Sequence, residues 1–78
     1  MRLQGYEWRI FTHDHAPAHC HVKVGNGTIV LNLNDDASIR KIINKVKISY
    51  MKKVQDLIVE HLEFLLQEWA KIHETNEE

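Results

Sequence analysis

An apolar stripe of helical spacing runs along the C-terminal third of this 78-residue chain. Apolar side chains recur every three or four positions between residues 50 and 73, and Ser49 just before them is a favourable N-cap residue. The stripe consists of Val54, Ile58, His61, Leu65, Trp69 and Ile72, widened by Leu57 and Leu62. A helix with one apolar face needs a second layer to cover it. The sequence therefore predicts one long C-terminal helix, over residues 49–73, packed on the structure formed by the first half of the chain.

The first half of the chain has the alternating pattern of β-strands. Residues 6–12 and 19–24 alternate polar and apolar side chains and are rich in aromatic and β-branched types. Pro17 lies in the return between these two segments, where its fixed φ favours a turn. Gly25-Asn26-Gly27 predicts a tight hairpin that leads into a third strand at residues 28–33.

The stretch after the turn at Asn34-Asp35-Asp36 fits two structures. Apolar residues at 39, 42, 43 and 46 have helical spacing, whereas their β-branched character favours a strand. The expected fold is therefore α+β, with an antiparallel three- to four-stranded sheet packed against one long C-terminal helix. We expect residues 1–78 to form a single small domain, with residues 74–78 as a frayed acidic tail. The predicted core contains Trp8 or Ile10, Val22, Val24, Ile29, Leu31, Leu33, Leu57, Ile58, Leu65 and Trp69.

Composition restricts the class of protein. The 44% hydrophobic and 27% charged residues are ordinary for a globular domain. A single cysteine, Cys20, cannot form an internal disulfide, which favours a reducing, cytoplasmic location. No apolar run is long enough for a signal peptide core or a membrane span, so we expect no membrane contact.

Charge is segregated along the chain even though the formal net charge is only −1. Residues 37–53 contain six basic and no acidic side chains, and the acidic residues are concentrated after them. The basic side chains are Arg40, Lys41, Lys45, Lys47, Lys52 and Lys53. Such a segment is a candidate surface for an acidic partner or for phosphates, or simply a solvated face. Nucleic acid is weakly supported, because no aromatic residue interleaves the basic residues before Tyr50.

Four of the six histidines lie between residues 13 and 21. Residues i and i+2 of a strand point to one face, so a His-x-His pair can direct two imidazoles at one ion. We expect His15, His19 and His21 to be ligands of Zn²⁺ or another divalent transition metal, with His13 as a candidate fourth ligand. Asp14 is expected either in the second shell, orienting a ring, or as a ligand itself. The alternatives are histidines that lock the turn by hydrogen bonds without metal, or that transfer protons.

The remaining cysteine and histidines are expected to have structural roles. Cys20 alternates with His19 and His21 and should be a small buried apolar residue. His61 on the helical stripe is expected to be a hydrogen-bonded core histidine, and His73 to complement the helix C-terminus. The chain contains no complete catalytic motif, neither His-Glu-x-x-His nor a Cys-x-x-Cys pair, which favours a non-enzymatic role.

The run Phe11-Thr12-His13-Asp14-His15-Ala16-Pro17-Ala18-His19-Cys20-His21-Val22, with Leu65-Leu66-Gln67-Glu68-Trp69 near the end, resembles the bacterial domain-of-unknown-function 4160 family. Matched position by position, the family motif falls on Asp14, His15, Pro17, His19 and His21. Ala16 and Ala18 depart from the asparagine and second proline often found there. The resemblance implies that residues 38–43 form a fourth strand.

The family that the chain resembles has no established activity. Family members are small bacterial proteins, often encoded beside another small protein, and some are labelled toxin–antitoxin components. We therefore expect a binding or regulatory module that acts through a protein partner, with a histidine-rich metal site. A metal- or histidine-dependent hydrolase acting on nucleic acid is the alternative.

Overall fold

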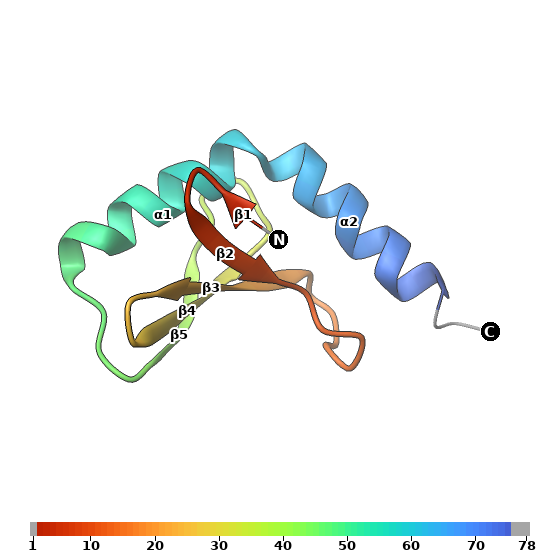
Figure 1. The fold of residues 1–78 in the computed structure, drawn as a ribbon. Coiled ribbons are helices and arrows are strands. Elements are labelled where there is room, and N and C mark those ends of the chain that lie inside the picture. The colour runs from red at the N-terminus through yellow and green to blue at the C-terminus, as the bar shows by residue number, and fades with distance from the viewer. Residues whose placement is uncertain (1, 76–78) are drawn as a thin grey trace.

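The computed structural model describes residues 2–75 of the chain. Five strands are followed by two helices, and the strands form one antiparallel sheet in chain order (Figure 1). The strands are β1 (Arg2–Leu3), β2 (Tyr6–Arg9), β3 (His19–Val24), β4 (Gly27–Asn32) and β5 (Ile39–Ile43), and the helices are α1 (Ile48–Glu60) and α2 (Leu62–Thr75). The α+β class and the antiparallel sheet are confirmed. The two-residue strand β1 was not predicted.

The β3–β4 hairpin follows the local sequence closely. Strand β3 has the predicted bounds, and β4 begins at Gly27, one residue earlier than expected. The two turn residues are Gly25, at φ 59°, and Asn26. Strand β2 ends at Arg9 rather than at Thr12, because the backbone N–H of Phe11 donates to the carboxylate of Asp14.

Residues 39–43 form strand β5, as the family resemblance implied, and the helical spacing of their isoleucines was misleading. β5 pairs with β4 from Thr28↔Ile43 to Leu31↔Ile39, with a register shift between Val30 and Leu31. Pairing satisfies backbone donors and acceptors of β4 that would otherwise lie at an open edge.

The prediction of one long helix is wrong, because the helical segment is divided at His61 (Figure 1). The backbone of His61 leaves the helical conformation at φ −110° and ψ 21°. Helical hydrogen bonds continue on both sides, from His61 N to Leu57 O and from Leu65 N to His61 O. Ser49 is not the N-cap: α1 begins at Ile48, and the capping position, Lys47, makes no side-chain hydrogen bond.

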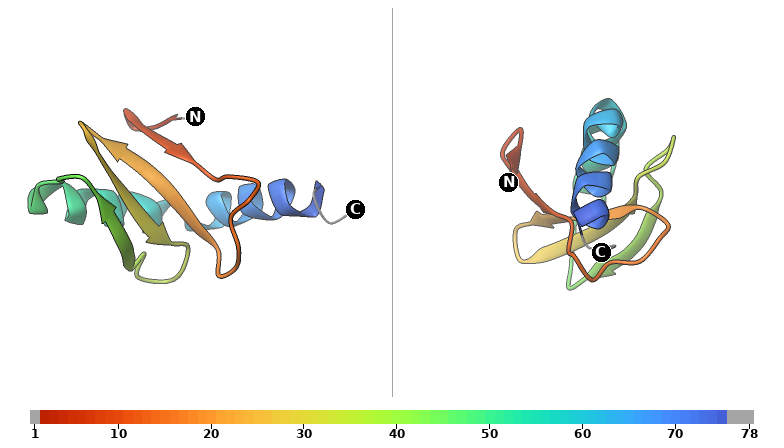
Figure 2. Two further views of the ribbon diagram at one scale, coloured as in Figure 1. Left: turned by 90° about the horizontal axis from the view of Figure 1, so that it is seen from below. Right: turned by 90° about the vertical axis from the view of Figure 1, so that its right-hand side faces the viewer.

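The core lies between one face of the sheet and the two helices, while the other face of the sheet is open (Figure 2, left). Every predicted core residue is buried except Trp69, which is half-buried and packs at the edge. The buried cluster consists of Trp8, Ile10, Cys20, Val22, Val24, Ile29, Leu31, Leu33, Ala37, Val54, Ile58 and Leu65. Over the described residues, neither helix has the length and apolarity required to cross a membrane. Of the predicted frayed tail, residues 76–78 lie outside the described residues, whereas the backbone of 74 and 75 belongs to α2.

Candidate metal centre

Strand β3 carries His19 and His21 on the face that does not point into the core. The intervening Cys20 and the following Val22 are buried in the core cluster, as strand alternation requires. His19 lies at the first position of β3, directly after the loop that contains Pro17. The two imidazoles therefore lie side by side, with their ring centroids 5.6 Å apart.

Asp14 is brought to these imidazoles by the loop that connects β2 with β3. Its backbone N–H donates to the carbonyl of Phe11 at 3.1 Å, and the Phe11 N–H donates back to the Asp14 carboxylate at 3.0 Å. At the far end of α2, the Nε2 atom of His73 lies 2.9 Å from the carbonyl oxygen of Asp14. The loop is thus held both from within and by the last turn of α2.

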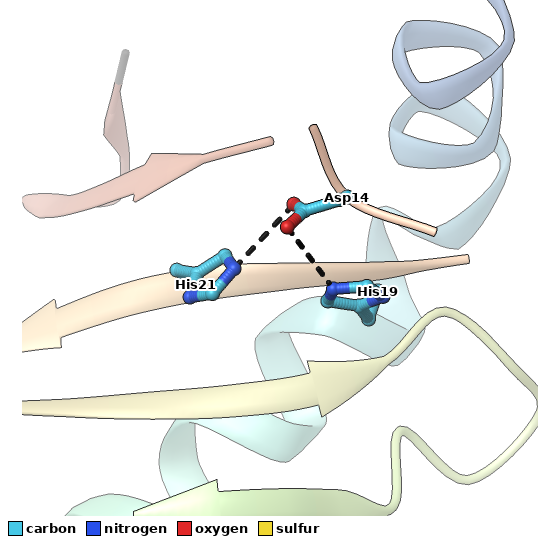
Figure 3. Close-up of side chains that lie close together, drawn as sticks. All are labelled: Asp14, His19 and His21. Carbon is cyan, nitrogen blue, oxygen red and sulfur yellow. Dashed lines mark ion pairs between the residues drawn. The ribbon is translucent and has the colours of Figure 1, made fainter. Parts of the chain in front are cut away.

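The carboxylate of Asp14 lies between the two histidines (Figure 3). Its Oδ1 atom is 3.4 Å from His19 Nε2, and its Oδ2 atom is 3.4 Å from His21 Nε2. One ligand atom from each of the three residues lies within 4.8 Å of the others. The side chains of His19, Asp14 and His21 are 9%, 14% and 22% exposed, which largely shields the group from water. We call these three residues the His/Asp cluster.

The second ring nitrogen of His19 distinguishes two states of the cluster. Its Nδ1 atom lies 2.8 Å from the carbonyl oxygen of Pro17 and 2.7 Å from Arg40 Nη1. If Nδ1–H donates to Pro17, the lone pair of Nε2 in the neutral ring faces the Asp14 carboxylate, and a cation between them relieves the repulsion. If Arg40 donates to Nδ1 instead, Nε2–H points at Asp14, and the cluster is a metal-free turn lock.

His21 presents a second ring nitrogen to the Asp14 carboxylate. Its Nε2 atom is buried and has no hydrogen-bond partner among the described residues, and the 3.4 Å separation from Asp14 exceeds an ordinary hydrogen bond. The edge-to-face contact with Phe11, at 4.8 Å between ring centroids, limits the movement of its ring. A buried ring nitrogen that faces a carboxylate without a hydrogen bond to it needs another partner. A metal ion between the two groups would bind both of them.

The other sequence candidates are placed differently. His13 and His15 are exposed and lie outside the His/Asp cluster. Of the two roles expected for Asp14, the position of its carboxylate directly beside both imidazoles favours that of a ligand. The geometry therefore places an aspartate where the sequence analysis placed a third histidine.

The six basic residues of the predicted partner surface are distributed over β5, the connection to α1, and α1. Arg40 contacts His19, Lys41 is exposed on β5, and the remaining residues lie beyond β5. Lys45 and Lys47 occupy the connection to α1, whereas Lys52 pairs with Asp56 at 2.7 Å and the Lys53 ammonium lies 5.8 Å from the Tyr50 ring centroid.

Cys20 has the predicted role of a small buried apolar residue. Its side chain is fully buried, and burial raises the pKa of the thiol to about 12, with a further contribution from the negative charge of Asp14. Burial and strand alternation thus direct this thiol into the core, away from the face that carries His19 and His21. His61 differs from expectation, because its buried Nε2 has no hydrogen-bond partner among the described residues.

Sequence reasoning missed the aromatic support that α2 gives to the cluster. The Trp69 ring lies 5.4 Å from the ring centroid of His19 and stacks at 3.8 Å on His73. The spacing of Trp69 and His73, four positions apart in a helix, indicates that they are neighbours. No local signal indicates that Trp69 reaches β3.

The fold and the cluster define a small α+β protein with two histidines and a carboxylate beside the open face of its sheet. The family described as Domain of unknown function (DUF4160) matches residues 5–70, and the chain belongs to this family. Comparisons with curated proteins and with solved structures give no match.

Proposed function

We propose that the protein is a small binding module that holds one divalent transition metal ion on Asp14, His19 and His21. The observation that carries this proposal is the His/Asp cluster itself, in which three ligand atoms lie within 4.8 Å of one another. The buried His21 Nε2, which lacks a hydrogen-bond partner among the described residues, is the donor that most needs such an ion. In the state in which the Pro17 carbonyl accepts from His19 Nδ1–H, Nε2 is free to bind the ion, and metal binding would select this state over the one in which Arg40 donates to Nδ1.

Zn²⁺ is the first candidate for the ion. Two imidazole nitrogens and one carboxylate oxygen are zinc ligands, and three protein ligands leave a position for water or for a group from a partner. Ni²⁺ and Cu²⁺ bind the same ligand types, so a nickel column would load the site artificially. Metal measurements therefore require untagged protein treated with chelator.

Calorimetric titration with Zn²⁺ tests the proposal. We expect saturable uptake of one ion per chain at neutral pH, and loss of uptake at pH 5, because protonated imidazoles do not coordinate metal. The variant His19→Ala/His21→Ala should take up no zinc. Absence of uptake by the unmodified protein at micromolar zinc would leave the histidines as a turn lock and would end the metal proposal.

A metal-dependent hydrolase acting on nucleic acid is a second candidate, favoured by the same three-ligand set. Three protein ligands with an open position are typical of catalytic rather than structural zinc sites. Zinc-loaded and chelator-treated protein should be incubated with RNA and with DNA. Metal-dependent cleavage that disappears in His19→Ala/His21→Ala would support catalysis, whereas inertness with every divalent metal would contradict it.

A protein partner remains part of the proposal. The open coordination position and the exposed lysines that are not committed to the His/Asp cluster, such as Lys41 and Lys53, are the features that a partner surface would meet. A toxin–antitoxin pair is one setting in which such a module would act.

A further inference from the structure

A cleft of about 790 Å³ lies at the end of the sheet opposite the start of β3, where the His/Asp cluster begins. Its walls are the Gly25–Asn26 turn, the start of β2 and the connection from β5 to α1. In Figure 1 the turn between β3 and β4 and the connection from β5 to α1 lie at the left, away from the loop between β2 and β3. The volume falls within the range of about 300–1,000 Å³ that is usual for small-ligand sites.

The charge of the cleft is entirely positive. Lys23, Lys45 and Lys47 line it, and no aspartate or glutamate does. Lys23 faces Glu7 across the β2–β3 register, but the carboxylate of Glu7 is already paired with Arg9 at 3.0 Å, which lowers the pKa of Glu7. Within the described part of the chain, none of the three lysines forms an ion pair. An anionic ligand would therefore meet three ammonium groups, of which only Lys23 has a carboxylate, that of Glu7, opposite it in the sheet.

The backbone fixes the position of two of these lysines. Strand β4 begins at Gly27, where a Cβ atom would lie 2.6 Å from the carbonyl oxygen of Lys45 and 2.6 Å from the Val46 side chain. Asn44, in the left-handed conformation at φ 63°, donates its side-chain amide to the carbonyl of Asn26 at 3.1 Å. The segment that carries Lys45 and Lys47 is thus packed directly against the hairpin.

Two tyrosines line the same cleft from different elements. Tyr6 comes from β2 and is half-buried, whereas Tyr50 comes from α1 and is 38% exposed. Aromatic rings beside cationic side chains are the surfaces on which nucleobases stack. The basic segment lacks an interleaved aromatic residue before Tyr50 in the sequence, and the fold supplies Tyr6 from elsewhere in the chain.

We propose that this cleft binds a nucleotide, with its phosphate on Lys23, Lys45 and Lys47 and its base against Tyr6 or Tyr50. The nucleotide is either free or one unit of a single strand, because both present the same phosphate and base. An acidic peptide would use the three cations but would leave the tyrosines without a role. This inference does not depend on the His/Asp cluster, which lies at the other end of β3.

Amide-resolved NMR titration of the chelator-treated full chain tests the inference. The probes are AMP, a short single-stranded oligoadenylate, inorganic phosphate and a glutamate-rich peptide. We expect saturable shifts of the Gly25, Asn26 and Lys45 amides with AMP, and weaker shifts with phosphate, which lacks the base. Tighter binding of the oligoadenylate than of AMP would identify the single strand as the source, and equal affinity would identify the free nucleotide.

Neutralising variants locate the site. Lys45→Gln/Lys47→Gln should weaken AMP binding at least about tenfold, because two charge-assisted contacts are removed. The matched control Lys41→Gln/Lys52→Gln removes the same charge outside the cleft and should bind AMP unchanged. Tyr50→Ala should weaken AMP binding about fivefold or more without changing phosphate binding.

Three results would overturn the inference. They are no saturable shift with AMP or oligoadenylate at millimolar concentration, equal weakening in the two double-lysine variants, and binding of the glutamate-rich peptide in place of nucleotides. An amide spectrum of each variant that keeps the dispersion of the unmodified protein shows that lost binding is not lost folding.

Discussion

Replacement of Leu65 by alanine should lower the free energy of unfolding by about 2–5 kcal/mol. Leu65 is 0% exposed and belongs to the core cluster between α2 and the sheet, so the truncation removes buried apolar surface and leaves a cavity. The total stability of a domain this small is near the lower end of about 5–15 kcal/mol, so the truncation should remove a large part of it. Urea unfolding followed by circular dichroism measures the change.

The neighbouring residue provides the control for this truncation. Leu66 is 39% exposed on the same helix, so Leu66→Ala removes the same atoms and keeps the helix propensity effect. We expect it to cost much less than Leu65→Ala. Equal midpoints for the two variants would contradict the packing of α2 described above.

Loss of any one member of the His/Asp cluster should weaken zinc binding at least about 100-fold, since even groups that only orient a ligand contribute about 10–100-fold. Asp14→Asn is the informative variant, because it keeps the size of the side chain and removes the charge that faces both imidazoles at 3.4 Å. Zinc affinity is measured by competition with a chelating dye.

The sequence and the structure make opposite predictions for two other histidines. His13→Ala/His15→Ala removes as many imidazoles as His19→Ala/His21→Ala, but both residues are exposed and lie outside the His/Asp cluster. The structure predicts unchanged zinc affinity for this control. A large loss in His13→Ala/His15→Ala, together with normal affinity in Asp14→Asn, would restore the all-histidine ligand set.

The elements that sequence reasoning placed well depend on neighbours along the chain. The β3–β4 hairpin was predicted because strand alternation and the Gly-Asn-Gly turn act over a few residues. The break at His61 could not be predicted, because the apolar stripe continues across it with unchanged spacing. The isoleucines of β5 were ambiguous because their own periodicity is helical. Pairing with β4 is what makes this segment a strand.

The candidate site shows the same division. Strand alternation places His19 and His21 on the same face of β3, and it also accounts for the burial of Cys20 between them. The position of Asp14 depends on how its loop closes on Phe11, and the contact of Arg40 with His19 joins residues 21 positions apart. Such contacts depend on the tertiary fold. A single sequence therefore indicates which residue types form the site, but not which particular residues come together in it.

Because of the break at His61, the two helices contact different ends of the protein. The half before the break begins beside the lysine-lined cleft and contributes Tyr50 to it, and the half after the break supports Asp14 and His19 through His73 and Trp69. Helix α1 therefore contributes to the cleft, whereas α2 contacts the His/Asp cluster. A substitution in α1 should therefore affect ligand binding in the cleft and not metal binding by the His/Asp cluster. A substitution in α2 should have the opposite effect.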